Sequence, residues 1–289
     1  MFRITEREAM YLVTGASGNV GSRVLAELQK EGKRIRVLTS DPKKAATFGD
    51  GVDVVVGGFG KADAIKKALT GVSHIFLMNR GLTDEALVDL LQIAHGNECK
   101  RIVFLSSIAA KLPELTLGKL HLQQEQRILA SPIQARIVRA TAFMSNTLQW
   151  AESIKTQGAV FNPMGDGSFA PIAPEDIAAF ATRLLVDDGD YEDVSSITGP
   201  ELLTASKQIA TLSEILGIPI QRIDITDQQA IEQIMRAGFP RQMASAVAEV
   251  YGAVRTGSSA ELLRTFELVM GNSPRTFATW AQENKARFV

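Results

Sequence analysis

The chain has 289 residues, a formal net charge of −1, 45% hydrophobic residues and 22% charged residues, which is the composition of a folded globular protein and excludes a disordered or fibrous one. Because a near-neutral charge gives no long-range attraction for polyanions, nucleic acids and acidic membrane surfaces are not expected as partners. The single cysteine excludes an intrachain disulfide, no apolar run reaches the roughly 20 residues of a membrane span, and the first ten residues lack a signal-peptide core, so we expect a cytoplasmic protein.

Apolar runs alternate with helical patterns through the first half of the chain. The expected elements, in chain order, are strand 9–14, helix 19–32, strand 34–40, short helix 42–49, strand 52–58, helix 62–71, strand 74–79, helix 83–99, strand 101–107, helix 120–131 and strand 134–143. Continuous apolar strands separated by helices indicate a parallel sheet covered on both faces. Right-handed crossovers then make this an α/β fold with a doubly wound parallel sheet, the Rossmann arrangement.

The pattern changes after Met144. Residues 156–176 are rich in glycine and proline and predict loops around short strands, residues 174–189 predict a helix, and the chain beyond Pro200 is mainly helical. We therefore expect a Rossmann domain over 1–150 and a smaller, mainly helical C-terminal region over 151–289, with part of 170–200 completing the first domain.

Three glycines separate the first expected strand from the first expected helix, in the spacing G-x-x-G-x-x-G. In a dinucleotide fingerprint the first glycine allows a tight turn, the second lets a pyrophosphate approach the backbone, and the third lets helix and strand pack closely. Free N–H groups and the positive end of the helix dipole then face the phosphates. The alternative is a tight turn without a ligand. The residues expected at the phosphates are Gly15, Ser17, Gly18, Asn19, Val20 and Gly21.

The end of the second strand bears on the choice between NAD and NADP. An acidic side chain there would bind the ribose hydroxyls and repel a 2′-phosphate. The strand ends in the hydroxyl residues Thr39 and Ser40, and the first acid, Asp41, directly precedes a proline, which favours a helix cap over a ribose contact. The two hydroxyls, with Lys43 and Lys44 one turn on, suit a 2′-phosphate, and the residues expected there are Thr39, Ser40 and Lys43. The alternative for both lysines is a solvated surface. We expect NADP(H) to be preferred, with NAD(H) as the alternative.

Polar residues also follow the fourth and fifth strands. Asn79 and Arg80 come after the fourth strand, and Ser106 and Ser107 close the fifth. Because ligands bind at the carboxyl ends of parallel strands, we expect Asn79, Arg80 and Ser106 beside the cofactor. A loop role for Asn79 and Arg80 and a helix-capping role for the two serines are the alternatives.

The tyrosines of the chain exclude one familiar mechanism. None of Tyr11, Tyr191 and Tyr251 is followed by lysine four residues later, so the tyrosine–lysine pair of ordinary short-chain alcohol dehydrogenases is absent. Hydride transfer itself needs only a nicotinamide held close to an acceptor. A quinone or a polarised C=N or N=N bond accepts hydride readily, and a proton can follow from water or a nearby acid.

Lys119 and His121 are the candidate catalytic residues, placed just before a helix that we expect to begin near Leu120. The imidazole of His121 titrates near neutral pH, and the ammonium of Lys119 can stabilise a developing oxyanion. The alternatives are a hydrogen-bonded helix-start role for His121, paired with Glu125 one turn on, and a surface position for Lys119.

A metal site is not expected. His95 and Cys99 have the i, i+4 spacing of two ligands on one helix face, but His74 is expected to end a turn, His121 stands alone, and a metal site usually needs three or four ligands. Cys99 is better explained as a small buried hydrophobic residue.

The glycine turn and several later segments resemble the NmrA-like group of atypical short-chain dehydrogenases/reductases. The likeness extends over nearly the whole chain. It is carried by residues 13–21, the run 120–146 with a His-x-x-x-Glu helix, an arginine-bearing sixth strand and a Phe-Met-x-Asn loop, residues 170–181 and 195–217, and residues 271–288. The motif residues are His121, Glu125, Arg139, Phe143, Met144 and Asn146. The resemblance implies NAD(P) binding and a substrate cleft between the two domains.

The chain also departs from the family pattern. Many relatives carry arginine at the position of Thr39, and many have Gly-Asp-Phe where this chain has Gly57-Gly58-Phe59. The clearest 2′-phosphate partner and the carboxylate on the adenine side are therefore absent, although Phe59 remains suited to packing near the adenine.

Known members of this group reduce quinones, azo dyes or triphenylmethane dyes, and others sense the cofactor without evident catalysis. We therefore expect an NAD(P)H-dependent reductase of a quinone, dye or other conjugated acceptor, with a non-catalytic NAD(P)-sensing regulator as the alternative. The expected partner is a small hydrophobic or aromatic substrate, and the residues that border the expected cleft are Met144, Phe161, Met164 and Phe169. Core packing is the default role of such residues and remains the alternative. The oligomeric state is left open.

Overall fold

The computed structural model describes residues 9–289, and nearly all of the segment where no signal peptide was expected lies outside this range. Contacts divide the described chain into two units. Unit 1 comprises residues 9–106, 121–139 and 174–195, and unit 2 comprises 107–120, 140–173 and 196–289. Among the described residues, no helix is both long and apolar enough to cross a membrane.

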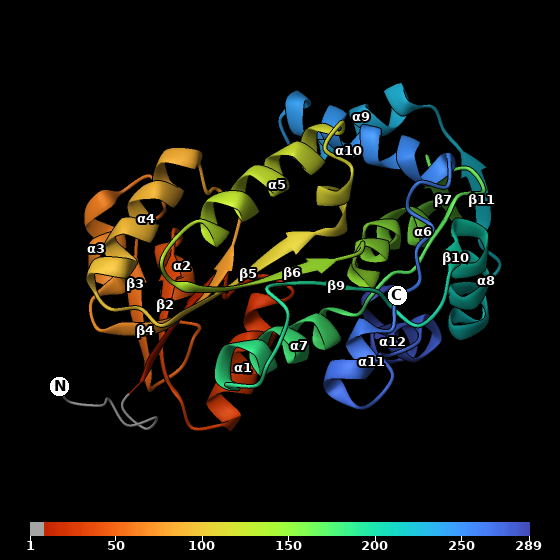
Figure 1. The fold of residues 1–289 in the computed structure, drawn as a ribbon. Helices are drawn as coiled ribbons and strands as arrows, with labels where there is room; N and C mark the ends of the chain where they lie inside the picture. Colours follow the sequence, from red (N-terminus) through yellow and green to blue (C-terminus); the bar gives the residue numbers. More distant parts are fainter. Residues whose placement is uncertain (1–8) are drawn as a thin grey trace. The chain divides into compact units, whose positions relative to one another are not determined.

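A seven-stranded sheet with the order β3-β2-β1-β4-β5-β6-β9 organises unit 1 (Figure 1). The neighbouring strands from β1 to β5 pair in parallel, and the strand order reverses between β1 and β4, which confirms the doubly wound α/β fold. The strands are β1 Met10–Thr14, β2 Arg34–Thr39, β3 Val52–Val56, β4 Val72–Met78, β5 Arg101–Ser107, β6 Gln134–Ala140 and β9 Val194–Ile197; the last two continue into unit 2.

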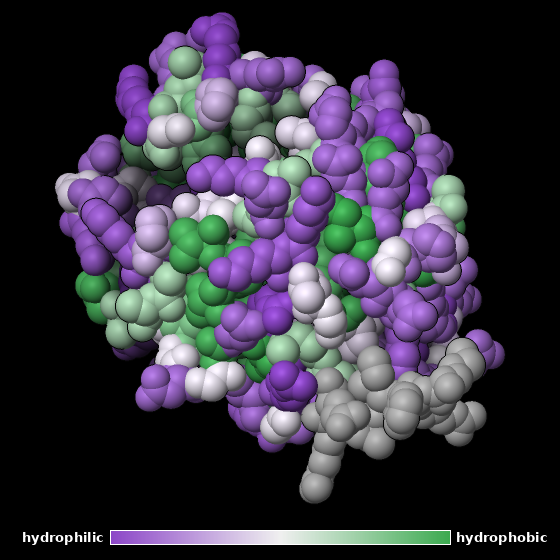
Figure 2. Space-filling model, turned by 90° about the vertical axis from the view of Figure 1, so that its left-hand side faces the viewer, coloured by the Kyte–Doolittle hydropathy of each residue, from purple (hydrophilic) through white to green (hydrophobic). Residues whose placement is uncertain are grey.

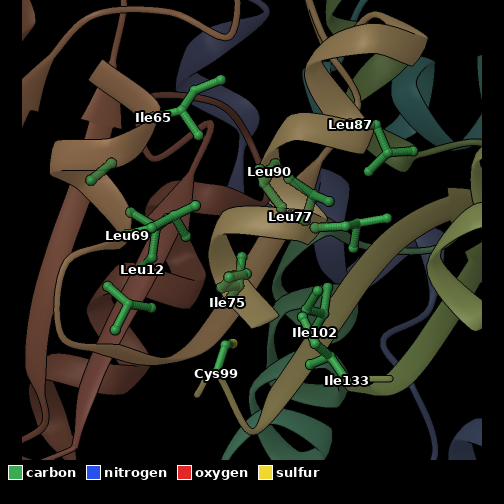
Figure 3. Close-up of a cluster of buried hydrophobic side chains, with 14 of the residues drawn as sticks. Leu12, Ile65, Leu69, Ile75, Leu77, Leu87, Leu90, Cys99, Ile102 and Ile133 are labelled. Carbon is green, nitrogen blue, oxygen red and sulfur yellow. The ribbon is translucent and has the colours of Figure 1, made fainter. Parts of the chain in front are cut away.

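Helices connect these strands, and their apolar faces form the core with the sheet. They are α1 Gly21–Lys30, α2 Pro42–Ala45, α3 Ala62–Leu69, α4 Asp84–Gly96, α5 Thr116–Leu129 and α7 Pro174–Val186. Leucines at helical spacing on α4, such as Leu87 and Leu90, are buried against Ile75 and Leu77 of β4 (Figure 3). The same cluster holds Cys99, whose burial raises the pKa of its thiol to about 12 and confirms its structural role.

The outermost strand on one side of the sheet is β3. A shallow groove runs along this strand and α3, with Val54, Val56, Lys61, Asp63 and Lys67 among its lining residues, and Val56 is 50% exposed. The face on the left of Figure 1, where β3 and α3 lie, shows apolar residues among hydrophilic ones (Figure 2).

Unit 2 is mainly helical and has its own core. Trp280 and Phe288 are completely buried, together with Phe277 and Met144, in a cluster separate from that of unit 1. Two small sheets pair β8 with β10 and β7 with β11. The elements are η1 Ile108–Lys111, η2 Met144–Trp150, α6 Ala151–Gln157, β7 Ala159–Asn162, β8 Ser168–Phe169, β10 Leu203–Thr204, α8 Ala205–Leu216, β11 Gln221–Asp224, α9 Asp227–Arg236, α10 Arg241–Arg255, α11 Thr265–Met270, α12 Phe277–Glu283 and η3 Lys285–Arg287.

The expected start of the helix near Leu120 was wrong, because α5 begins at Thr116 and so contains Lys119 and His121. The backbone N–H of Thr116 donates to Oε2 of Glu249 at 2.7 Å, and its hydroxyl donates to Oε1 at 3.0 Å. A carboxylate 133 residues away in sequence thus caps the helix, which no local pattern can indicate. Within the first turn, a Cβ at Gly118 would lie 2.1 Å from the carbonyl oxygen of Leu112, so this position needs glycine.

Two smaller expectations were also wrong. His74 lies inside β4 and stacks on Tyr11 with ring centroids 4.7 Å apart, rather than ending a turn. The helix α4 ends at Gly96, so His95 and Cys99 do not share a helix face. The intervening Glu98 takes a positive φ of 58°, which turns the chain into β5.

Candidate functional site

The glycine loop after β1 has the backbone geometry of an anion-binding turn. Gly15 has a φ of +64°, and the N–H of Gly18 donates to the carbonyl of Gly15 at 2.9 Å, which closes the turn. A Cβ at Gly21 would lie 2.3 Å from that same oxygen, and one at Gly18 would lie 3.2 Å from it. Side chains at these two positions would therefore fill the space in which the loop folds against the start of α1.

The N-terminus of α1 lies directly behind this loop. No side chain caps the helix, whose N-cap residue is the fully buried Val20, while Ser17, Gly18 and Asn19 are exposed. The first N–H groups of an uncapped helix carry a partial positive charge that attracts anions. Arg23, in the first turn, is held by Glu175 of α7 at 2.6 Å. The geometry is suited to a diphosphate bound by backbone amides.

The end of β2 confirms the capping role of Asp41. Its carboxylate accepts a hydrogen bond from the backbone N–H of Lys43 at 2.9 Å and starts α2. Thr39 is buried, and its hydroxyl accepts from the backbone N–H of Asp41 at 3.3 Å, so it already has a structural partner. Ser40 is exposed at the same end of the strand.

One lysine of α2 contacts the glycine loop. Nζ of Lys44 donates to Oγ of Ser17 at 3.4 Å, whereas Lys43 is simply exposed. An ammonium at this place lies between the phosphate loop and the end of β2. The sequence indicated Lys43 rather than Lys44 at this position, because the helical phase of a helix as short as α2 cannot be read from the sequence.

After β3, the two glycines make room for packing. A Cβ at Gly57 would lie 2.3 Å from Cβ of Ala64 on α3, and a Cβ at Gly58 would touch Ser40 at 3.6 Å. Phe59 is half-buried against the core of unit 1. The close helix approach thus explains Gly57.

Asn79, Ser106 and His121 meet at the carboxyl ends of β4 and β5. Nδ1 of His121 lies 3.3 Å from Oγ of Ser106, and its Nε2 lies 3.3 Å from Nδ2 of Asn79. The neighbouring Arg80 is exposed, and Ser107 caps η1 by accepting from the N–H of Ala109. Three of the residues singled out from sequence are therefore in direct contact.

Behind them lies a buried ion pair. Glu125, one turn beyond His121 on α5, is 1% exposed and accepts two hydrogen bonds at 3.0 Å from Nε of Arg139 on β6. Its Oε1 also accepts from the hydroxyl of Ser106 at 2.5 Å. The sequence indicated Arg139 only as a motif residue and Glu125 also as a partner of His121 at i, i+4 spacing; in the structure Glu125 instead binds Arg139 and Ser106.

Burial lowers the pKa of His121, and the nearby Glu125 carboxylate only partly opposes this effect. The imidazole is therefore neutral near pH 7, unlike the titrating group that the sequence suggested. Lys119 is exposed on α5. Because it lies two residues before His121, the two side chains are on different faces of the helix.

A doubly wound sheet with a glycine loop after its first strand defines the class of Rossmann-type α/β proteins, in which ligands bind at the carboxyl ends of the strands. The sequence model of the NmrA-like family matches residues 8–271, so the chain belongs to the NmrA-like family.

Reductases are prominent among similar proteins. The chain is 32% identical over 281 residues to a (4-alkanoyl-5-oxo-2,5-dihydrofuran-3-yl)methyl phosphate reductase of Streptomyces griseus, covering 96% of this chain and 99% of the relative. It is 29% identical over 283 residues to an NAD(P)H azoreductase of Xenophilus azovorans, covering 96% and 99%. The solved structure of an NADPH-dependent quinone oxidoreductase from Escherichia coli complexed with NADPH matches with a TM-score of 0.82 at 22% identity, covering 95% and 99%.

Proposed function

We propose that this protein is an NADPH-dependent reductase that transfers hydride to a quinone, a dye or another conjugated small molecule. The observation that carries the proposal is the glycine loop, in which Gly15, Gly18 and Gly21 let the backbone turn tightly before α1, whose N-terminus has no side-chain cap and suits a diphosphate. The reductases among its relatives support hydride transfer over a purely regulatory role.

The residues present fit a dinucleotide. The amides of Ser17 and of residues 19–21 would hold the diphosphate, and the half-buried Phe59 would pack near the adenine. Asn79, Arg80 and Ser106, at the ends of β4 and β5, would lie along the nicotinamide half.

NADPH is favoured over NADH by charge at the end of β2. The carboxylate of Asp41 caps α2, so it is not positioned to bind the ribose hydroxyls or to repel a 2′-phosphate. Lys44 is held at the edge of the phosphate loop by Ser17. Lys43 and Ser40 are exposed nearby, and the hydroxyl of the buried Thr39 faces the same turn. We propose that these groups receive the 2′-phosphate, with Lys44 as the principal cation.

When bound, the reduced nicotinamide supplies the hydride, and the chain positions it. Because burial keeps the imidazole of His121 neutral, we assign the proton that follows to water rather than to an imidazolium. Lys119, the other candidate from the sequence, is exposed on a different face of α5 from His121, so we assign it no part in the reaction. The buried Cys99 thiol, the only cysteine, is consistent with a cytoplasmic location, which we also propose.

The test is to mix purified protein with NADPH and a panel of benzoquinones, naphthoquinones, azo dyes and triphenylmethane dyes, and to follow the absorbance of the reduced nicotinamide. We expect oxidation above the protein-free rate with at least one acceptor class. Tight NADPH binding without turnover on any acceptor would instead identify a cofactor-sensing protein.

A further inference from the structure

Five side chains, from two strands, one helix and the residue that follows β4, form a continuous polar chain in unit 1. In order they are Arg139, Glu125, Ser106, His121 and Asn79. The chain runs from the buried Arg139–Glu125 pair to an amide at the carboxyl end of β4. The ion pair is far better shielded than a surface bridge, so its geometry is firmly held.

The protons of this chain can be assigned from its fixed charge. The carboxylate of Glu125, paired with a guanidinium, only accepts hydrogen bonds, so the hydroxyl proton of Ser106 points to Oε1 across 2.5 Å. Oγ of Ser106 is then an acceptor toward His121, whose Nδ1 must carry the ring proton. The unprotonated Nε2 accepts from Nδ2 of Asn79 at 3.3 Å.

We infer that Glu125 and Arg139 are positioning residues that act through Ser106 and His121 to orient the amide of Asn79 toward the cofactor. With Nδ2 bound to His121, the other end of the amide, Oδ1, is the acceptor offered to a hydrogen-bond donor on the nicotinamide half. The inference rests on the proposed function for its last step, but the tautomer of His121 does not depend on it.

The tautomer is tested on the ligand-free protein. The chain has three histidines, so ¹⁵N labelling gives three imidazole patterns, and a His121→Gln variant assigns the one of interest. At pH 7 we expect a neutral ring protonated at Nδ1. A ring protonated at Nε2, or a charged ring, overturns the inference whether or not the protein is a reductase.

The adjacent serines give a matched pair of variants. Ser106→Ala removes the hydroxyl that links Glu125 to His121, whereas Ser107→Ala removes only the cap of η1. For the best acceptor found, we expect Ser106→Ala to lower kcat about tenfold with less than a threefold change in the NADPH dissociation constant, and Ser106→Thr to restore most of kcat. Ser107→Ala should stay within twofold of the parent.

A double-mutant cycle completes the test. Asn79→Ala should cost about tenfold in kcat in the parent and less than twofold in the Ser106→Ala background, because the amide is already released. Full additivity of the two changes, or equal kinetics of the Ser106→Ala and Ser107→Ala variants, overturns the inference. Absence of turnover in the parent protein contradicts the proposed function and leaves the tautomer experiment decisive.

Discussion

At the scale of single residues, Lys44 shows how one contact bears on cofactor choice. Its ammonium is held by Ser17 at the rim of the glycine loop, so a change to glutamate places a negative charge where the 2′-phosphate is proposed to bind. We expect Lys44→Glu to raise the KM for NADPH at least tenfold and to leave the KM for NADH within threefold. The measurement is initial rates with both cofactors.

Lys100→Glu is the control for this charge change, because Lys100 is exposed before β5, at the opposite end of the strands. It should leave both KM values nearly unchanged. An equal loss of NADPH and NADH affinity in the Lys44 variant would show that the lysine does not sense the 2′-phosphate.

His74 makes a second prediction, about stability. Burial, with the nearby Arg101 and Lys100 cations, lowers the pKa of His74 from 6.5 to about 4. The unfolded chain therefore binds this proton first, and stability that is present above pH 6.5 is lost as the pH falls toward 4, by up to about 3 kcal/mol. His74→Phe keeps a ring against Tyr11 but cannot titrate, so the loss between these pH values should be smaller.

The measurement is the free energy of urea unfolding at pH 7 and pH 4.5 for the parent and the variant. His95→Asn, at an exposed histidine on α4, serves as the control and should follow the parent. An identical pH dependence in the His74→Phe variant would rule out this histidine as a source of acid sensitivity.

At the scale of elements, the start of α5 depends on a distant carboxylate. Removing the cap with Glu249→Ala leaves the N–H of Thr116 without its partner and should destabilise the fold by about 1 kcal/mol. Hydrogen exchange in the first turn of α5 should speed up accordingly. Glu261→Ala is the control, because it removes only an exposed salt bridge to Lys111 of η1, and it should cost less than about 0.5 kcal/mol of stability.

The same element shows which parts of the fold a sequence can predict. The first six strands of the sheet and the helices between them have strong local periodicity and were predicted, as was the glycine turn, whereas the short strand β9 was not. The first turn of α5 has little apolar periodicity and was missed, because its stability comes from α10. The series of hydrogen-bonded side chains from Arg139 to Asn79 was also missed. Its members come from β5, β6, α5 and the end of β4, and they meet only when the sheet is assembled.

At the scale of the whole molecule, cofactor binding should be visible as stability. A ligand present at 100 times its dissociation constant stabilises the native state by about 2.7 kcal/mol, which for a chain of this size raises Tm by about 4 °C. We expect NADPH to give this shift in differential scanning fluorimetry and NADH a smaller one.

Gly18→Asp is the matched variant for this experiment, because its Cβ would lie 3.2 Å from the carbonyl oxygen of Gly15 and its carboxylate would repel the diphosphate. It should show no shift with either cofactor. A normal NADPH shift in this variant would place the diphosphate elsewhere.

The domain boundary at residue 150 stays a prediction. The contacts define two units, and the polypeptide passes repeatedly from one to the other.

The outer strand β3 has a consequence for handling the protein. Within the described residues its far edge has no neighbouring strand, and the half-exposed Val56 lies at its end. The lysines along the groove, Lys61 and Lys67, repel a second copy approaching edge to edge. Concentrated salt screens that repulsion, so we expect aggregation through this edge to make salted-out or freeze-concentrated samples turbid, while dilute low-salt buffers should keep samples clear.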